Sequence, residues 1–127
     1  MTCIDISPKM NRIAERVKAR AQAENMRIIT ASGAATGLPA SSQDKVFVMQ
    51  TDLPETIHWQ PLINEVRRIL KKDPRARFVF SFAAKKKQDI DDVLGSVRRN
   101  RFDFTALKYA SAGNIDAVMV IAKPVLF

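Results

Sequence analysis

Basic residues are the side chains of this sequence whose type and spacing most readily suggest chemistry. Of the 21 lysines and arginines among 127 residues, 12 lie between Arg67 and Arg101, and the formal net charge is +8. Such a cluster can neutralise several phosphates, so its affinity for nucleic acid would fall steeply with salt. The alternative is a solvated face, but the acidic residues interleave unevenly with the basic ones, which favours binding. The predicted phosphate-binding residues of this cluster are Arg67, Arg68, Lys71, Lys72, Arg75, Arg77, Lys85, Lys86, Lys87, Arg98, Arg99 and Arg101.

A second basic stripe lies near the start of the chain. Arg12, Arg16 and Arg20 recur every four residues beside apolar residues that also have helical spacing. This pattern predicts a basic amphipathic helix over about 8–24. We add these three arginines to the candidate nucleic-acid-binding residues.

Aromatic side chains could complete a surface for unpaired bases. Tyr109 carries a polar hydroxyl and lies beside Lys108, so it is the best candidate for stacking. Phe78, Phe80 and Phe82 share one face of an alternating strand, where a place in the core is the better interpretation. Only Tyr109 therefore joins the predicted binding residues.

Catalytic motifs are absent from the sequence. His58 is the only histidine and Cys3 the only cysteine, so a set of histidine or thiolate metal ligands cannot be assembled. The four glycines form no glycine-rich phosphate loop. We predict that the protein is not an enzyme and has no catalytic residue, no metal site and no cofactor.

The single cysteine also bears on the compartment. It cannot form an internal disulfide, which favours a reducing environment. No apolar run reaches the ~18 residues that a membrane span needs. We predict a cytoplasmic protein that does not associate with a membrane.

The elements that must position these residues fall into two parts. Ser7 and Pro8 form a typical helix start for the basic helix, and Met26–Ala31 is predicted to be a short strand after it. The segment 32–42 is rich in Gly, Ala and Ser and is predicted to be a linker. We therefore expect an N-terminal helix–strand arm with its linker over 1–44 and a main nucleic-acid-binding domain over 45–127.

The main domain is predicted to have an α+β fold with the order βαβαββ. Two helices packed on one face of a four-stranded mixed sheet are the simplest arrangement. The predicted strands are 45–51, 77–83, 102–109 and 115–122, and the predicted helices are about 60–72 and 88–100.

Two segments of the main domain resemble a known family. Residues 58–82 (HWQPLINEVRRILKKDPRARFVFSF) are similar to the C-terminal domain of bacterial translation initiation factor 3, with paired arginines in a helix, a charged turn and an alternating strand. Residues 117–124 look like the terminal strand of that family, and the Alba chromatin proteins share the general topology. The resemblance covers about 45–124. The family's arginine- and glycine-containing loop is replaced here by 83–87 (AAKKK).

The resemblance implies that the helix arginines, the lysine loop and the arginines that end the second helix of the main domain face RNA. We predict a non-enzymatic protein that binds single-stranded DNA or RNA with low sequence specificity and regulates transcription or translation. The alternative is a module that docks on an acidic partner, such as a polymerase or a ribosome-associated factor, through its basic helix. We also expect a homo-oligomer, a dimer or higher, because Alba-like proteins are dimers and the apolar segment 125–127 could pack against a second subunit.

Overall fold

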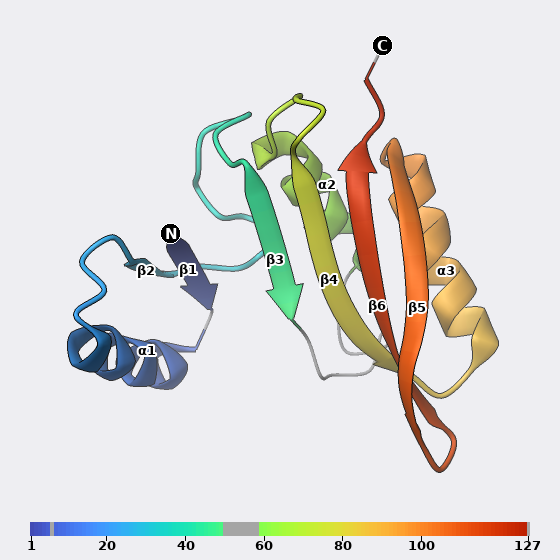
Figure 1. Ribbon diagram of the computed structural model, residues 1–127, viewed down its shortest axis with the longest axis horizontal. Coiled ribbons are helices and arrows are strands. Elements are labelled where there is room, and N and C mark those ends of the chain that lie inside the picture. The colour runs from blue at the N-terminus through green and yellow to red at the C-terminus, as the bar shows by residue number, and fades with distance from the viewer. Residues whose placement is uncertain (6, 50–58, 127) are drawn as a thin grey trace. The chain divides into compact units, whose positions relative to one another are not determined.

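The computed structural model describes residues 1–5, 7–49 and 59–126 (Figure 1). The chain divides into two compact units, Met1–Gly37 and Leu38–Phe127. The boundary lies within the segment 32–42 that was predicted to be a linker. Within the described ranges, no helix has the length and apolar character that a membrane crossing requires.

The first unit is a βαβ motif. It consists of β1 (Thr2–Asp5), α1 (Pro8–Ala21) and β2 (Arg27–Thr30), and β1 pairs with β2 in parallel. Ser7 begins the helix as predicted, because its Oγ accepts the N–H of Met10 at 3.3 Å and proline follows at the first helical position. The predicted helix–strand arm is wrong in one respect, because the prediction did not include β1, which the structure has. A strand of four residues carries too little periodicity to be detected, and it is stabilised by pairing with a strand some twenty residues later.

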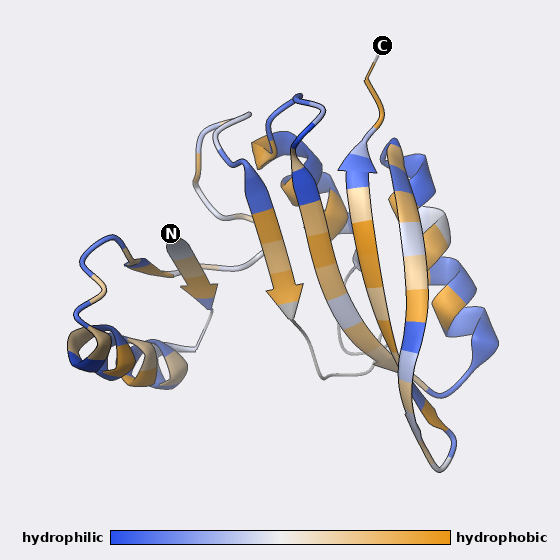
Figure 2. Cartoon of the chain, viewed as in Figure 1, coloured by the Kyte–Doolittle hydropathy of each residue, from blue (hydrophilic) through white to orange (hydrophobic). Residues whose placement is uncertain are grey.

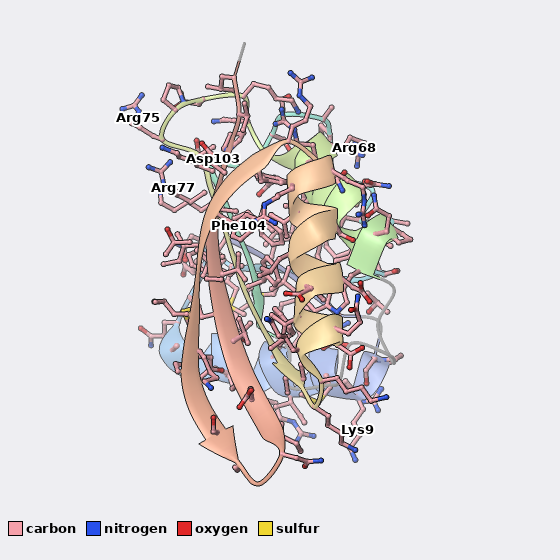
Figure 3. All side chains as sticks on the ribbon, turned by 90° about the vertical axis from the view of Figure 1, so that its right-hand side faces the viewer. Lys9, Arg68, Arg75, Arg77, Asp103 and Phe104 are labelled. Carbon is pink, nitrogen blue, oxygen red and sulfur yellow. The ribbon has the colours of Figure 1, made fainter. Side chains whose placement is uncertain are left out.

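The second unit has a four-stranded mixed sheet in the order β3-β4-β6-β5. Strand β4 pairs in parallel with β3 and antiparallel with β6, which pairs antiparallel with β5. Both helices cover the same face of the sheet (Figures 1 and 3). The elements are β3 (Lys45–Met49), α2 (Trp59–Ile69), β4 (Arg77–Ala84), α3 (Lys87–Arg99), β5 (Phe102–Ala112) and β6 (Ile115–Pro124). The last two residues of the strand predicted over 45–51 lie outside the described residues.

The core lies between this sheet and the two helices. Phe78, Phe80 and Phe82 are at most 1% exposed, and successive ring centroids are 4.8 and 5.9 Å apart. Ile63 from α2 and Val97 from α3 pack over them and are fully buried. The prediction that these three phenylalanines belong to the core is confirmed, and they cannot stack on a ligand.

The opposite face of this sheet is also apolar. Phe47, Leu107 and Ile121 are 64%, 54% and 43% exposed, and Figure 2 shows hydrophobic residues in all four strands, with polar residues between them and at the strand ends.

The segment that follows the unit boundary completes the C-terminal end of α2. The N–H of Ser41 donates to the carbonyl of Arg68 at 2.9 Å, and the N–H of Ser42 donates to that of Ile69 at 2.8 Å. These two carbonyls lie in the last turn of the helix and have no partner within it. Residues 38–44 are therefore a structural part of the second unit.

Candidate functional site

Ligands of open α/β sheets bind outside the carboxyl ends of the parallel strands. In the first unit these ends are Asp5 and Thr30, which pair in register. Asn11 of α1, 8% exposed, donates from Nδ2 to the Asp5 carbonyl at 3.0 Å and to the Thr30 Oγ1 at 2.8 Å. A buried amide thus holds the two strand ends together.

The Asp5 carboxylate lies directly before the N-terminus of α1. Its Oδ1 accepts the N–H of Ser7 at 2.8 Å, a local bond of the Asx-turn type. Among the described residues no other contact engages this carboxylate, so Oδ2 can accept hydrogen bonds from a ligand. The positive end of the α1 dipole favours a negative charge at this position.

In the second unit, the carboxyl ends of β4 and β5 lie at the same edge of the sheet. Ala84 of β4 and Ser111 of β5 both pair with Asp116 of β6. Of the predicted binding residues, this carboxyl edge carries four exposed side chains. They are Lys85, Lys86, Lys87 and Tyr109.

Acidic residues follow the three lysines along the chain. Asp89, Asp91 and Asp92 lie in the first two turns of α3, which begins at Lys87 without a side-chain cap. Acidic residues at a helix N-terminus compensate its dipole. The carboxyl edge of this unit is therefore mixed in charge.

Most of the predicted binding residues lie at the opposite edge. This amino edge is formed by the C-terminal ends of α2 and α3 and by the starts of β4 and β5, and Figure 3 shows Arg68, Arg75 and Arg77 at this end together with Asp103. Because β4 is eight residues long, about 26 Å of strand separates the two edges. The amino edge carries Arg67, Arg68, Lys71, Lys72, Arg75, Arg77, Arg98, Arg99 and Arg101.

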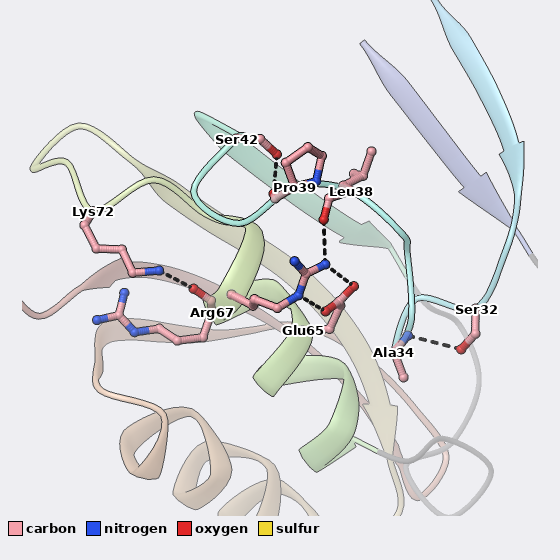
Figure 4. A network of polar contacts seen from close by, with 9 residues as sticks. Ser32, Ala34, Leu38, Pro39, Ser42, Glu65, Arg67 and Lys72 are labelled. Atoms are coloured by element: carbon pink, nitrogen blue, oxygen red, sulfur yellow. Dashed lines mark hydrogen bonds and ion pairs between the residues drawn. The ribbon is translucent and has the colours of Figure 1, made fainter.

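Several of these cations have partners within the chain. Arg68 donates to both oxygens of the buried Glu65 at 2.6 and 2.9 Å and to the carbonyl of Leu38 at 2.7 Å (Figure 4). The hydrogen bond to Glu65 raises the pKa of Arg68 above its ordinary value. Lys71 pairs with Asp44 at 2.9 Å. These contacts fix the segment 38–44 to α2.

Other arginines of this edge bind backbone or lie over rings. Arg77 donates from Nη1 to the carbonyls of Pro74 and Ala76 at 2.7 and 2.8 Å. The Cζ of Arg98 lies 5.0 Å from the centre of the Phe104 ring, and Arg99 donates to the Ser96 Oγ at 3.0 Å. Cations at helix C-termini also interact favourably with the helix dipole.

The remaining candidates lie in the other unit. Arg12, Arg16 and Arg20 are exposed on α1. Within the second unit the predicted residues therefore lie at two ends of the sheet, because the length of β4 and of α3 separates charges that are close in the sequence. Asp5 was not among them, although its place two residues before the Ser7-Pro8 helix start is a signal for a strand end before a helix.

Comparison with known proteins identifies the class of the chain. Residues 1–78 match the model of a methyltransferase domain family. This match covers more than half of the chain, which therefore belongs to that family of methyltransferase domains. No curated protein matches the chain significantly in sequence.

Solved structures agree on the fold. The [4+2]-cyclase SpnF has a TM-score of 0.83 at 12% identity, covering 99% of this chain and 67% of that protein. Geranyl diphosphate C-methyltransferase from Streptomyces coelicolor, solved with S-adenosyl-L-homocysteine, gives 0.78 at 12% identity, covering 98% and 64%. An rRNA methylase from Streptococcus thermophilus gives 0.71 at 12% identity, covering 98% and 72%. The chain thus spans about two thirds of the length of these proteins.

These findings correct the predicted resemblance and fold class. The fold is methyltransferase-like, and a βαβαββ domain of the initiation factor 3 or Alba type is not supported. Two βαβ motifs, β1-α1-β2 and β3-α2-β4, each join a pair of parallel strands through a helix, as in doubly wound α/β folds. The second unit has the predicted order of elements and a mixed sheet, but the prediction lacked β1 and therefore the βαβ motif that precedes this unit.

The predicted function is corrected as well. A non-enzymatic regulator that binds single-stranded nucleic acid is wrong, and so is the prediction that the protein is not an enzyme, because the chain belongs to a methyltransferase domain family. The alternative of a non-catalytic docking module is wrong for the same reason. In the described part of the chain, no three His, Cys, Asp or Glu side chains gather to form a metal site.

Proposed function

We propose that this chain is part of an S-adenosylmethionine-dependent methyltransferase and that Asp5 binds the ribose of the cofactor. The observation that carries the proposal is the family match over residues 1–78, which includes the strand that ends at Asp5. When bound, the cofactor supplies an electrophilic methyl group on a sulfonium. The residues of this chain bind and orient it.

The geometry around Asp5 fits this role. In doubly wound folds, a carboxylate beyond a strand end accepts hydrogen bonds from ribose hydroxyls. Asp5 offers Oδ2 for this purpose, while Ser7 holds Oδ1 and Asn11 holds the Asp5 carbonyl. The carboxylate is thus oriented before a ligand arrives.

The sequence provides only part of the usual ligand cradle. Doubly wound folds commonly approach a nucleotide with a glycine-rich turn between strand and helix. The four glycines of this chain form no Gly-x-Gly, and the described turn from β1 to α1 contains Ser7. Asp5 and the residues that orient it therefore fit the ribose of the cofactor.

The variant Asp5→Asn tests the proposal in the full chain. The amide keeps an oxygen for the N–H of Ser7 but loses the charge, and its nitrogen cannot accept from a hydroxyl. A charge-assisted hydrogen bond contributes about 1.5–3 kcal/mol, so we expect the dissociation constants of S-adenosylmethionine and S-adenosylhomocysteine to rise roughly 10- to 100-fold. Isothermal titration calorimetry measures both.

The matched control is Asp103→Asn, which removes an exposed carboxylate at the amino edge and should leave both affinities unchanged. If the folded wild-type chain binds neither compound, the proposed function is overturned. If it binds both and Asp5→Asn has no effect, the assignment of Asp5 is wrong while the function stands.

We further propose a cytoplasmic location. It is supported by the single cysteine, Cys3, which is free and cannot form an internal disulfide. The homo-oligomer expected from the sequence stays a prediction.

A further inference from the structure

Arg67 makes an incomplete set of contacts at the C-terminal end of α2. Its Cζ lies 5.6 Å from the centre of the Phe102 ring, and its Nη2 donates to the Val125 carbonyl at the long distance of 3.4 Å. Within the described part of the chain, its Nη1 is buried without a hydrogen-bond partner. A buried donor that is left unsatisfied costs about 1–3 kcal/mol, so this nitrogen calls for an explanation.

Two further cations lie beside Arg67. Lys72 donates from Nζ to the Arg67 carbonyl at 2.9 Å, and Figure 4 shows its amino group near the guanidinium. Burial and the charge of Arg101 lower the pKa of Arg67, and burial and the charge of Arg67 lower that of Lys72. The carboxylate on this part of α2, Glu65, is engaged by Arg68. The three like charges therefore repel one another.

The backbone of Arg101 is also unusual. Its φ of 63° lies in the left-handed region, which glycine tolerates and other residues adopt at a cost of roughly 1–2 kcal/mol. Arginine stands at this position between α3 and β5, where glycine would fit the turn better. An arginine here adds positive charge beside Arg67.

We propose that Arg67 and Lys72, with the charge of Arg101, form a binding site for a phosphate group at the amino edge. Arg67 is only partly buried, so rotation about its terminal bonds can turn Nη1 towards an anion beside Lys72. A phosphate dianion offers several acceptor oxygens to the guanidinium fork and relieves the repulsion between the cations. The proposal does not rest on the proposed function, because none of these three residues is among those that hold the cofactor in it.

Titration of the full chain with inorganic phosphate tests the site. Amide chemical shifts are followed by NMR against sodium chloride at the same ionic strength. We expect saturable shifts at Arg101, Phe102 and Val125 with phosphate and none with chloride. Ribose 5-phosphate serves as a second ligand: equal affinity indicates that the site binds the phosphate group alone, and tighter binding indicates a sugar phosphate.

Two variants at the site have a matched control. Arg67→Met and Lys72→Met should each weaken phosphate about tenfold, since each removes charge-assisted hydrogen bonds. Arg75→Met is the control, because its side chain is 91% exposed at the same edge and its ion pair with Asp73 is long at 3.6 Å. It should bind phosphate as the wild type does.

Arg101→Gly keeps the test valid if the other variants fold poorly. Glycine suits the left-handed backbone, so this variant should unfold at or above the wild-type temperature and still bind phosphate more weakly. Shifts that are equal with chloride and phosphate would overturn the proposal. So would wild-type affinity in both Arg67→Met and Arg101→Gly.

Discussion

The two edges of the four-stranded sheet use their positive charge differently. At the amino edge, Arg68, Lys71 and Arg75 form the ion pairs found among the described residues. At the carboxyl edge, Lys85, Lys86 and Lys87 are exposed, and no described ion pair involves them. The comparison indicates that charge at the amino edge largely holds helix ends and turns in place, whereas charge at the carboxyl edge is available to solvent and ligands.

The largest expected effect is at Glu65, whose carboxylate is 8% exposed and binds Arg68 through both oxygens. Glu65→Gln replaces the buried carboxylate with a neutral amide. The guanidinium of Arg68, which also donates to the Leu38 carbonyl, then loses its charged partner. Because the Arg68 side chain is 42% exposed, we expect a loss of about 2 kcal/mol in the free energy of unfolding rather than the full penalty of a broken buried pair. Urea denaturation measures it.

The matched change at the carboxyl edge is Asp89→Asn, in the first turn of α3. It should cost about 0.5 kcal/mol, from weaker interaction with the helix dipole. An equal loss at Glu65 and Asp89 would contradict the difference between the edges.

A smaller effect concerns pH at the amino edge. The pKa of Lys72 is lowered by burial and by Arg67 from its ordinary 10.5. In the pH range just below 10.5, the folded state therefore binds fewer protons at this site than the unfolded state, so this group makes stability rise with pH. Urea denaturation at several pH values up to 10.5 should show that Lys72→Met removes this contribution, while Lys123→Met retains it. A slope that Lys72→Met leaves unchanged would rule out this cause.

The smallest effect is expected for the exposed lysines. Replacement of Lys85, Lys86 and Lys87 by glutamine together should change the free energy of unfolding by no more than about 0.5 kcal/mol, since exposed side chains without fixed partners contribute little. The same urea titration measures it, and Glu65→Gln serves as the sensitive reference. A loss comparable to that at Glu65 would show that the lysines have structural partners.

Local patterns in the sequence predicted most elements of the second unit. The alternation of Phe78, Phe80 and Phe82 identified β4 and its buried face, and helical spacing located α3 within one residue at each end. These patterns depend on neighbouring residues, which the sequence displays directly.

Pairing and the candidate site depend on distant residues and were not predicted. The parallel pairing of β1 with β2 joins residues that lie about 25 positions apart, and β1 has only four residues. Asp5 is a single carboxylate with no spacing partner, so its role emerges only once a strand end and a helix start are placed around it. Closeness in sequence also did not show that Lys85, Lys86 and Lys87 lie at the other end of β4 from the rest of the basic cluster.

The cap that residues 41–43 form on α2 has a kinetic consequence. The carbonyls of Arg68 and Ile69 receive their donors from a segment more than 25 residues earlier, and closing such a loop requires entropy to be lost before any contact is gained. We therefore expect these bonds to form after the transition state of folding. Variants that weaken them should accelerate unfolding and leave the folding rate nearly unchanged. Contacts of the segment 38–44 would thus affect the unfolding rate of the second unit, and with it the lifetime of the folded state, more than the folding rate.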